Sequence, residues 1–192
     1  MLRVDSRVPR NASGGKTQGG KNTLQVGAGK PRIVARGEWR LGEEAGDPWA
    51  GAKAGRWLGE KGGALVRAGV RAWRESGAKG AEGRAVGILG VGGGGEWPVW
   101  LEGASAREVV EQWRKRSPLW LLEVLPNLPA AQLAAEIGAR GPVETVRERE
   151  GVKEDVRRRI QRWGRRGVKW VVVVCSTSTG AQAEVWGWEA EK

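Results

Sequence analysis

Apolar residues recur at helical spacing in two stretches of the chain. In residues 59–77 the apolar positions, three and four residues apart, are Leu65, Val66, Gly69, Val70 and Trp73. In residues 151–166 they are Val152, Val156, Ile160 and Trp163. Such spacing puts the apolar side chains on one side of a helix and the polar ones on the other. Glycines close both stretches, so each predicts an amphipathic helix that ends there.

Two further helices are predicted from residues that typically begin or end a helix. Ser105 and Glu108 form a capping box, and Val109, Val110 and Trp113 supply the apolar side of the helix that we expect to run on to Pro118. A short, alanine-rich helix is predicted from Pro129 to Ile137, because Pro is favoured in the first helical turn and Gly138 follows the last residue.

Continuous apolar runs predict the strands. Residues 85–91 and 168–174 are apolar and rich in β-branched residues, which is typical of strands buried on both sides. Ile33 to Arg36 predicts a short edge strand. Strands that alternate with helices indicate an α/β layered domain, with a mixed sheet and helices on its faces. We assign residues 1–32 to a disordered arm, 33–180 to the folded domain and 181–192 to a tail.

The composition removes several kinds of chemistry. The 192 residues include no His and one Cys, Cys175. A Ser-His-Asp triad, a His-ligated zinc site, an internal disulfide and an iron–sulfur cluster are therefore excluded, and no metal or cofactor is expected. The sequence lacks the apolar stretch of a signal peptide, and no apolar run reaches the ~20 residues of a membrane helix. We expect a cytoplasmic protein without a membrane partner.

Positive charge is concentrated in two segments. The formal net charge is +11, with seven basic residues and one acidic residue in 1–32, and ten basic and four acidic residues in 147–169. The first segment is rich in Gly, Lys and Ser and has no apolar period, which is typical of disorder. The second contains the arginines that we name as candidate partner- or anion-binding residues: Arg157, Arg158, Arg162, Arg165 and Arg166.

Several short motifs occur in the order of a known family. They are residues 84–91 followed by glycines, Ser117-Pro118-Leu119, Leu125-Pro126-Asn127, Gly141-Pro142 and Thr145-Val146. Over residues 57–176 the chain resembles the N-terminal half of β-ketoacyl synthases, the thiolase-fold condensing enzymes of fatty-acid and polyketide synthesis. The resemblance implies a layered thiolase-like half-domain, a synthase subunit or acyl carrier protein as partner, and a homodimer formed through residues 143–146.

The sequence departs from this family at the catalytic position. The family's nucleophilic cysteine follows the Gly-Pro proline by eight residues, which is Glu150 here. We expect Cys175 to be a buried small apolar residue, since no cationic partner is evident. The family's two catalytic histidines belong to its C-terminal half, so Claisen condensation by that mechanism is not expected.

The helix predicted at 151–166 also differs from its family equivalent, which is buried in the middle layer of a five-layer sandwich. Burial of an unpaired charge costs several kcal/mol, more than an apolar side chain gains. We therefore expect one side of this helix to face water or an acidic partner.

Three hypotheses about function follow. The first is a noncatalytic assembly or chain-length-type subunit of fatty-acid or polyketide synthesis. The second is a module that binds a polyanion, namely RNA, DNA or an acidic carrier protein, through the arginines. The third is residual decarboxylation of a malonyl thioester at Glu150. The sequence does not identify the pathway, the acyl substrate or the partner chain.

Overall fold

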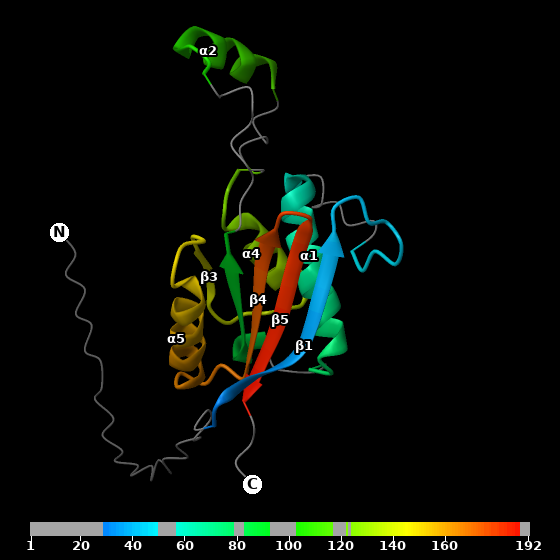
Figure 1. Cartoon of the computed structure of the whole chain (residues 1–192), viewed down its shortest axis with the longest axis vertical. Coiled ribbons are helices and arrows are strands. Elements are labelled where there is room, and N and C mark those ends of the chain that lie inside the picture. Colours follow the sequence, from blue (N-terminus) through cyan, green and yellow to red (C-terminus); the bar gives the residue numbers. More distant parts are fainter. Residues whose placement is uncertain are drawn as a thin grey trace, which may run out of the picture.

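The computed structural model describes residues 29–49, 57–78, 83–92, 103–116, 122 and 124–188, and its centre is a five-stranded mixed sheet (Figure 1). The strands are β1 (Pro31–Arg40), β2 (Val86–Val91), β3 (Val143–Val146), β4 (Trp170–Thr177) and β5 (Gly180–Trp188), in the spatial order β1-β5-β4-β2-β3. β2 is parallel to both of its neighbours, β3 and β4. β5 is antiparallel to β4 and to β1. The sheet is therefore parallel at one end and antiparallel at the other.

Helices cover both faces of this sheet. Helix α1 (Gly59–Glu75) and helix α4 (Leu128–Glu136) pack on one face, and helix α5 (Val152–Gly164) packs on the opposite face. A single turn of 3-10 helix, Gly83–Ala85, leads into β2. Helix α2 (Ala106–Lys115) extends away from the sheet (Figure 1). The predicted α/β layered architecture is confirmed.

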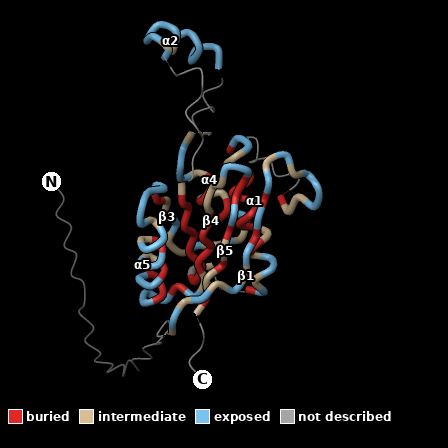
Figure 2. The backbone as a smooth tube through the Cα atoms, viewed as in Figure 1, coloured by how far each residue is buried: buried red, intermediate tan, exposed pale blue. Residues whose placement is uncertain are grey.

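The face under α1 and α4 carries the larger core. Successive residues of a strand point to opposite faces, so Ile88 and Val172 lie under α1 while Leu89 and Val171 lie under α5. On α1, alanine and glycine positions are buried against the sheet. Gly37 of β1 is packed so closely against α1 that a side chain there would collide with its backbone. Figure 2 shows the buried strands at the centre of the sheet and the exposed outer sides of the helices.

The sequence placed the helices and the two central strands to within three residues at each end, including the helix after Ser105. That helix ends at Lys115, with the capping box of Ser105 and Glu108 formed, and Pro118 lies outside the described residues. None of the described helices is long and apolar enough to cross a membrane.

The predicted domain boundaries are wrong at both ends. Residues 181–188, expected to be a tail, belong to β5, which pairs with two strands and so lies inside the sheet. The tail assignment failed because β5 begins with small apolar residues that alternate with polar ones and has no long apolar run. β1 is longer than Ile33 to Arg36 and begins at Pro31, within the predicted arm. The rest of that arm, residues 1–28, and residues 189–192 lie outside the described residues.

Candidate functional site

Helix α5 carries the arginines named from the sequence. It begins after Gly151, whose φ of 77° is a left-handed conformation that favours glycine. Val156, Ile160 and Trp163 are buried against the sheet, as the apolar period predicted. The predicted binding residues on and after the helix are all exposed: Arg157, Arg158, Arg162, Arg165 and Arg166. One side of α5 therefore faces solvent in this chain, as expected from the cost of burying its charges.

Ion pairs separate these arginines into two kinds. Arg157 contacts Glu154 at 2.7 Å in an exposed pair one turn apart on α5. Arg162 reaches Glu144 of β3 at 3.6 Å, and Glu144 also accepts a hydrogen bond from Arg159. Among the described residues no carboxylate pairs with the others, which are Arg158, Arg165 and Arg166.

The spacing along α5 divides the five residues further. Arg157 and Arg165 are eight residues apart and share one side of the helix with Gln161. Arg158 and Arg162 belong to the neighbouring stripe, where Arg162 turns toward β3. The structure therefore places four of the predicted residues on two stripes along α5 and its C-terminal cap, and the fifth, Arg166, in the turn that follows.

Glu150 occupies the turn between β3 and α5, the position at which the resemblance places a nucleophile. It is exposed, as are Glu148 and Arg149 beside it. The first turn of α5 contains the carboxylates of Glu154 and Asp155. These negative charges offset the positive end of the helix dipole, which would otherwise stabilise a developing oxyanion. In this turn the Glu150 carboxylate is exposed to water. The positive end of the α5 dipole is offset by Glu154 and Asp155, so it is not free to stabilise an oxyanion on an acyl group.

Cys175 lies on β4, half-buried on the α5 side of the sheet. Burial raises the pKa of its thiol, and the nearby carboxylates of Glu184 and Glu148 raise it further. The thiol is therefore protonated near neutral pH, whereas a nucleophilic cysteine needs cationic neighbours that lower its pKa. Cys175 is thus less buried than expected, although it does pack against apolar residues of the core.

A groove that the sequence analysis missed lies beside α5. It has a volume of about 210 Å³ and separates α5 from the start of β1 and from β5. The residues that line it are Lys30, Pro31, Arg157, Ile160, Gln161 and Trp186. Sequence reasoning could not assemble this groove because Lys30 and Pro31 were assigned to the arm and Trp186 to the tail.

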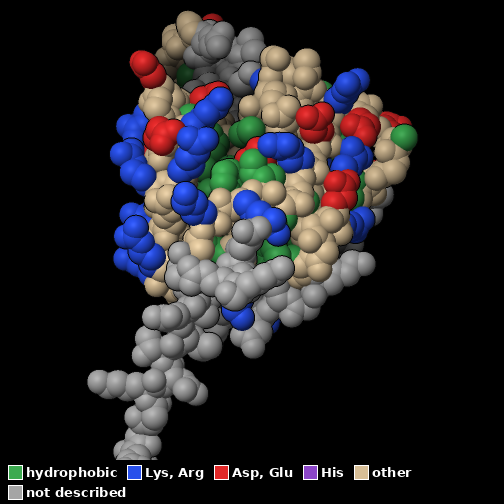
Figure 3. Space-filling model, turned by 60° about the horizontal axis from the view of Figure 1, so that its bottom comes forward, with side chains coloured by type: hydrophobic (Ala, Val, Ile, Leu, Met, Phe, Trp, Pro, Cys, Tyr) green, Lys and Arg blue, Asp and Glu red, His purple; other side chains and the backbone are tan. Residues whose placement is uncertain are grey.

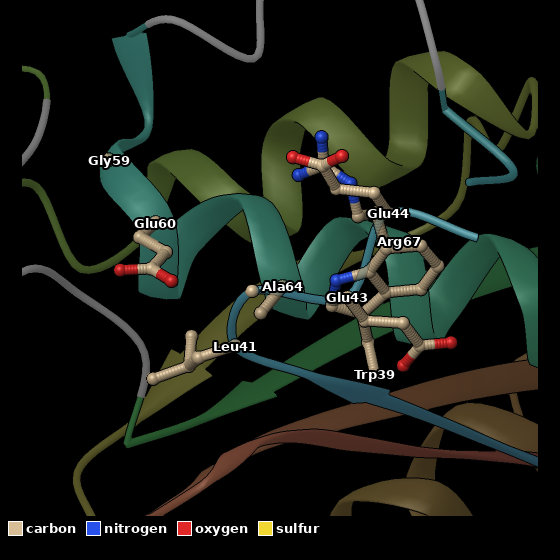
Figure 4. Close-up of a pocket in the computed structure, with 9 residues that line it drawn as sticks. Trp39, Leu41, Glu43, Glu44, Gly59, Glu60, Ala64 and Arg67 are labelled. Atoms are coloured by element: carbon tan, nitrogen blue, oxygen red, sulfur yellow. The ribbon is translucent and has the colours of Figure 1, made fainter. Parts of the chain in front are cut away.

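A second hollow, of about 390 Å³, lies between the end of β1 and the start of α1 (Figure 4). Trp39 forms part of its wall, and the guanidinium groups of Arg67 and Arg71 lie 5.5 and 4.7 Å from the centre of its ring. Arg67 also pairs with Asp47 at 2.8 Å, and Arg71 pairs with Glu43 at 2.9 Å. Two of the charged residues that line the hollow, Glu43 and Arg67, are thus already paired, and these pairs connect the end of β1 with α1.

Comparison with known proteins identifies the fold of this chain. No protein-family model matches the sequence, and no curated protein matches it. Among solved structures, one chain from a type II polyketide synthase acyl-carrier protein in complex with its ketosynthase bound to the hexaketide is similar, with a TM-score of 0.61 and 11% identity. The match covers 84% of this chain and 64% of that one, so this chain spans less than two thirds of its neighbour.

The priming β-ketosynthase from the R1128 polyketide biosynthetic pathway also matches, with a TM-score of 0.46 and 13% identity, over 83% of this chain and 50% of that one. At that score it adds nothing to the argument. The first match, together with the mixed sheet and its two helical layers, shows that the chain has the α/β fold of a thiolase-like half-domain.

Proposed function

We propose that this chain is a ketosynthase-like domain without condensing activity of its own, acting as an assembly or chain-length-type subunit in polyketide or fatty-acid synthesis. Its partner is a synthase chain or an acyl carrier protein. The fold supports the relation to ketosynthases. The chemistry of the turn after β3 supports the noncatalytic role.

The observation that carries the proposal is this turn between β3 and α5. The resemblance assigns the nucleophile to Glu150, which is a carboxylate exposed to water. The one thiol of the chain belongs to Cys175 on β4, 25 residues further along. A chain without histidine cannot supply an imidazole acid or base for thioester chemistry. Glu150→Ala is accordingly expected to leave any turnover of a malonyl thioester unchanged.

Two surfaces are suited to a partner. The outer side of α5 presents arginines, which complement an acidic surface such as that of a carrier protein. β3 is an edge strand of the sheet, and Val143 on it is 40% exposed. An exposed edge strand pairs readily with a strand of another chain, so β3 is the proposed contact of a homodimer.

The test combines activity with assembly. The purified chain is incubated with malonyl and acyl thioesters, alone and with the synthase and acyl-carrier chains encoded nearest to it. We expect no condensation product from the chain alone, and co-elution with a partner chain in size-exclusion chromatography. Condensation by the isolated chain would contradict the noncatalytic role. A monomer that binds neither partner would contradict the assembly role.

A second candidate function is the binding of a polyanion. The observation that favours it is that Arg158, Arg165 and Arg166 have no carboxylate partner within the described part of the chain. Phosphate binding by such residues releases counterions, so the affinity falls steeply with salt concentration. An affinity for a polyanion that is unchanged between low and moderate salt would exclude this candidate.

A further inference from the structure

The 210 Å³ groove beside α5 combines positive charge with an aromatic surface. Its floor is formed by the buried Ile160 and the half-buried Trp186. Lys30 and Arg157 bring positive charge to its rim, and Gln161 adds an amide. Figure 3 shows Lys and Arg side chains around an area where hydrophobic side chains reach the surface.

Trp186 is held in a fixed orientation. Its indole N–H donates a hydrogen bond to the Glu184 carboxylate at 3.1 Å, and its ring packs against the core under α5. Glu184 also lies 3.5 Å from Arg36 of β1, in an exposed pair that contributes little. A ring fixed in this way loses little side-chain freedom when a planar group stacks on it, so the cost of binding is low.

The positive charge continues from the groove along α5. Arg157, Gln161 and Arg165 recur every four residues and therefore line the same side of the helix. At a rise of 1.5 Å per residue, the backbone positions of Arg157 and Arg165 are about 12 Å apart, enough for more than one phosphate. The pair of Arg157 with Glu154 is exposed and so contributes little, which leaves this guanidinium able to exchange partners.

We propose that this groove binds single-stranded nucleic acid, with one unpaired base stacked on Trp186 and the adjoining phosphates held by Lys30, Arg157 and Arg165. The proposal deepens the polyanion candidate above and rests on it. Nucleotide chains without a partner strand are bound by this combination of basic groove and aromatic platform. A base in a duplex is stacked and paired, so it cannot lie on a ring inside a narrow groove.

Two other occupants fit the groove less well. An acidic polypeptide would satisfy the cations but would leave the indole face without a planar group. A second copy of this chain, with a net charge of +11, would bring less negative charge to the cations of the groove than a nucleotide chain does. The planar face and the row of cations together favour a nucleotide chain.

The experiment measures binding of the full chain to two ligands, a short fluorescent oligothymidylate and inorganic polyphosphate of similar total charge, at several salt concentrations. Trp186→Leu is expected to weaken oligothymidylate binding about tenfold, the size expected for loss of one base–aromatic stack, and to leave polyphosphate binding unchanged. Arg165→Gln is expected to weaken both ligands and to reduce the salt slope by about one. Arg114→Gln on α2, an exposed arginine outside the groove, is the matched control and is expected to change neither.

A second variant keeps the test valid if Trp186→Leu does not fold. Gln161 is exposed, so Gln161→Glu leaves the core intact while it adds a negative charge to the groove. We expect it to weaken oligothymidylate binding severalfold. The stacking site is wrong if both variants bind oligothymidylate as the wild-type chain does while polyphosphate still depends on Arg165, an outcome that preserves the polyanion candidate. Absence of binding to either ligand would reject both.

Discussion

The two faces of the sheet are covered in different ways. Under α1 and α4 the contact is made mainly by small and branched apolar residues together with the buried Trp39 and Trp49, and α1 alone buries nine residues. Under α5 only four residues of the helix are buried, and one of them is the large Trp163. Two further residues of α5, Arg159 and Arg162, form ion pairs with Glu144 of β3. One face is thus a closed apolar core, whereas the other is a charge-rich layer with its outer side open to water.

This difference shows how a short helix with many arginines can still be part of the fold. A buried Trp removes more apolar surface from water than any other side chain, so one residue anchors the helix. The charged residues then need only remain exposed or paired. The open layer is consequently free to evolve a binding surface, and the closed core is not.

The largest effect is expected from removing the anchor of α5. Trp163 is 2% exposed, and Trp163→Ala would leave a cavity under the helix, which costs about 4 kcal/mol of unfolding free energy. Denaturation by urea, followed by circular dichroism, measures the loss. Trp113→Ala on α2 is the control, because Trp113 is 48% exposed and its loss should cost less than about 1 kcal/mol. Equal losses in both variants would contradict the anchor role.

A smaller effect is expected from crowding the closed face. In Gly37→Ala the added methyl group would lie 2.5 Å from the carbonyl oxygen of Ala68 and 2.7 Å from the backbone nitrogen of Ala72. Because helix backbone cannot yield as a side chain does, α1 must shift, at a cost of about 3 kcal/mol. Thermal unfolding measures it. Val34→Ala, on the same strand and 37% exposed, should cost about 0.5 kcal/mol.

The ion pairs of the open face should contribute less to stability than the Trp163 anchor or the close packing at Gly37. Glu144→Gln keeps the side chain's size but removes the charge that Arg159 and Arg162 contact, and we expect a loss of about 1 kcal/mol or less. The loss should shrink in concentrated salt. The control is Glu154→Gln on α5, since the pair of Glu154 with Arg157 is more exposed than the pairs of Glu144. A greater loss for the control would show that burial does not set the strength of these pairs.

The smallest effect concerns α2, which neither core covers. Hydrogen bonds from the Ser105 hydroxyl and backbone N–H lower the pKa of Glu108 from its usual 4.5. Because the folded pKa is depressed, the capping box contributes stability above the unfolded pKa and loses it as pH falls through the folded pKa. Amide chemical shifts of residues 105–115 should therefore change below pH 4.5. In Ser105→Ala the midpoint of this pH-dependent change should rise toward the usual pKa of a glutamate. An unchanged midpoint would show that the hydrogen bonds from Ser105 do not lower the pKa of Glu108.

The elements with a strong period or a long apolar run could be predicted from the sequence. The apolar stripe of Val156, Ile160 and Trp163 fixed the buried side of α5, because a helix repeats its faces every 3.6 residues. The capping box at Ser105 fixed the start of α2 in the same local way. The exposure of the five arginines also followed, since the cost of burying charge does not depend on the details of the fold.

The last strand could not be recognised in this way. On β5, Ala181, Ala183 and Val185 lie on one face of the sheet, and Gln182 and Glu184 lie on the other. The apolar side chains on the first of these faces are small, and the two large ones, Trp186 and Trp188, lie on the face that carries Gln182 and Glu184, so the alternation is weak. The strand is stabilised by hydrogen bonds to two neighbours. The groove beside α5 was missed for the same reason, because Lys30 and Trp186 are 156 residues apart in the chain.

The sequence by itself determined the α/β class, the positions of the main helices and the absence of imidazole chemistry, because these depend on residue types and on spacing within one element. Only the tertiary structure decided that β5 lies inside the sheet, that Arg162 is paired while Arg165 has no carboxylate partner among the described residues, and that an aromatic floor adjoins the basic side of α5. These features arise from contacts between segments that are far apart in the chain. Hydrogen bonds and charge interactions depend on the distance between atoms in space, which the spacing of residues along the sequence does not reveal.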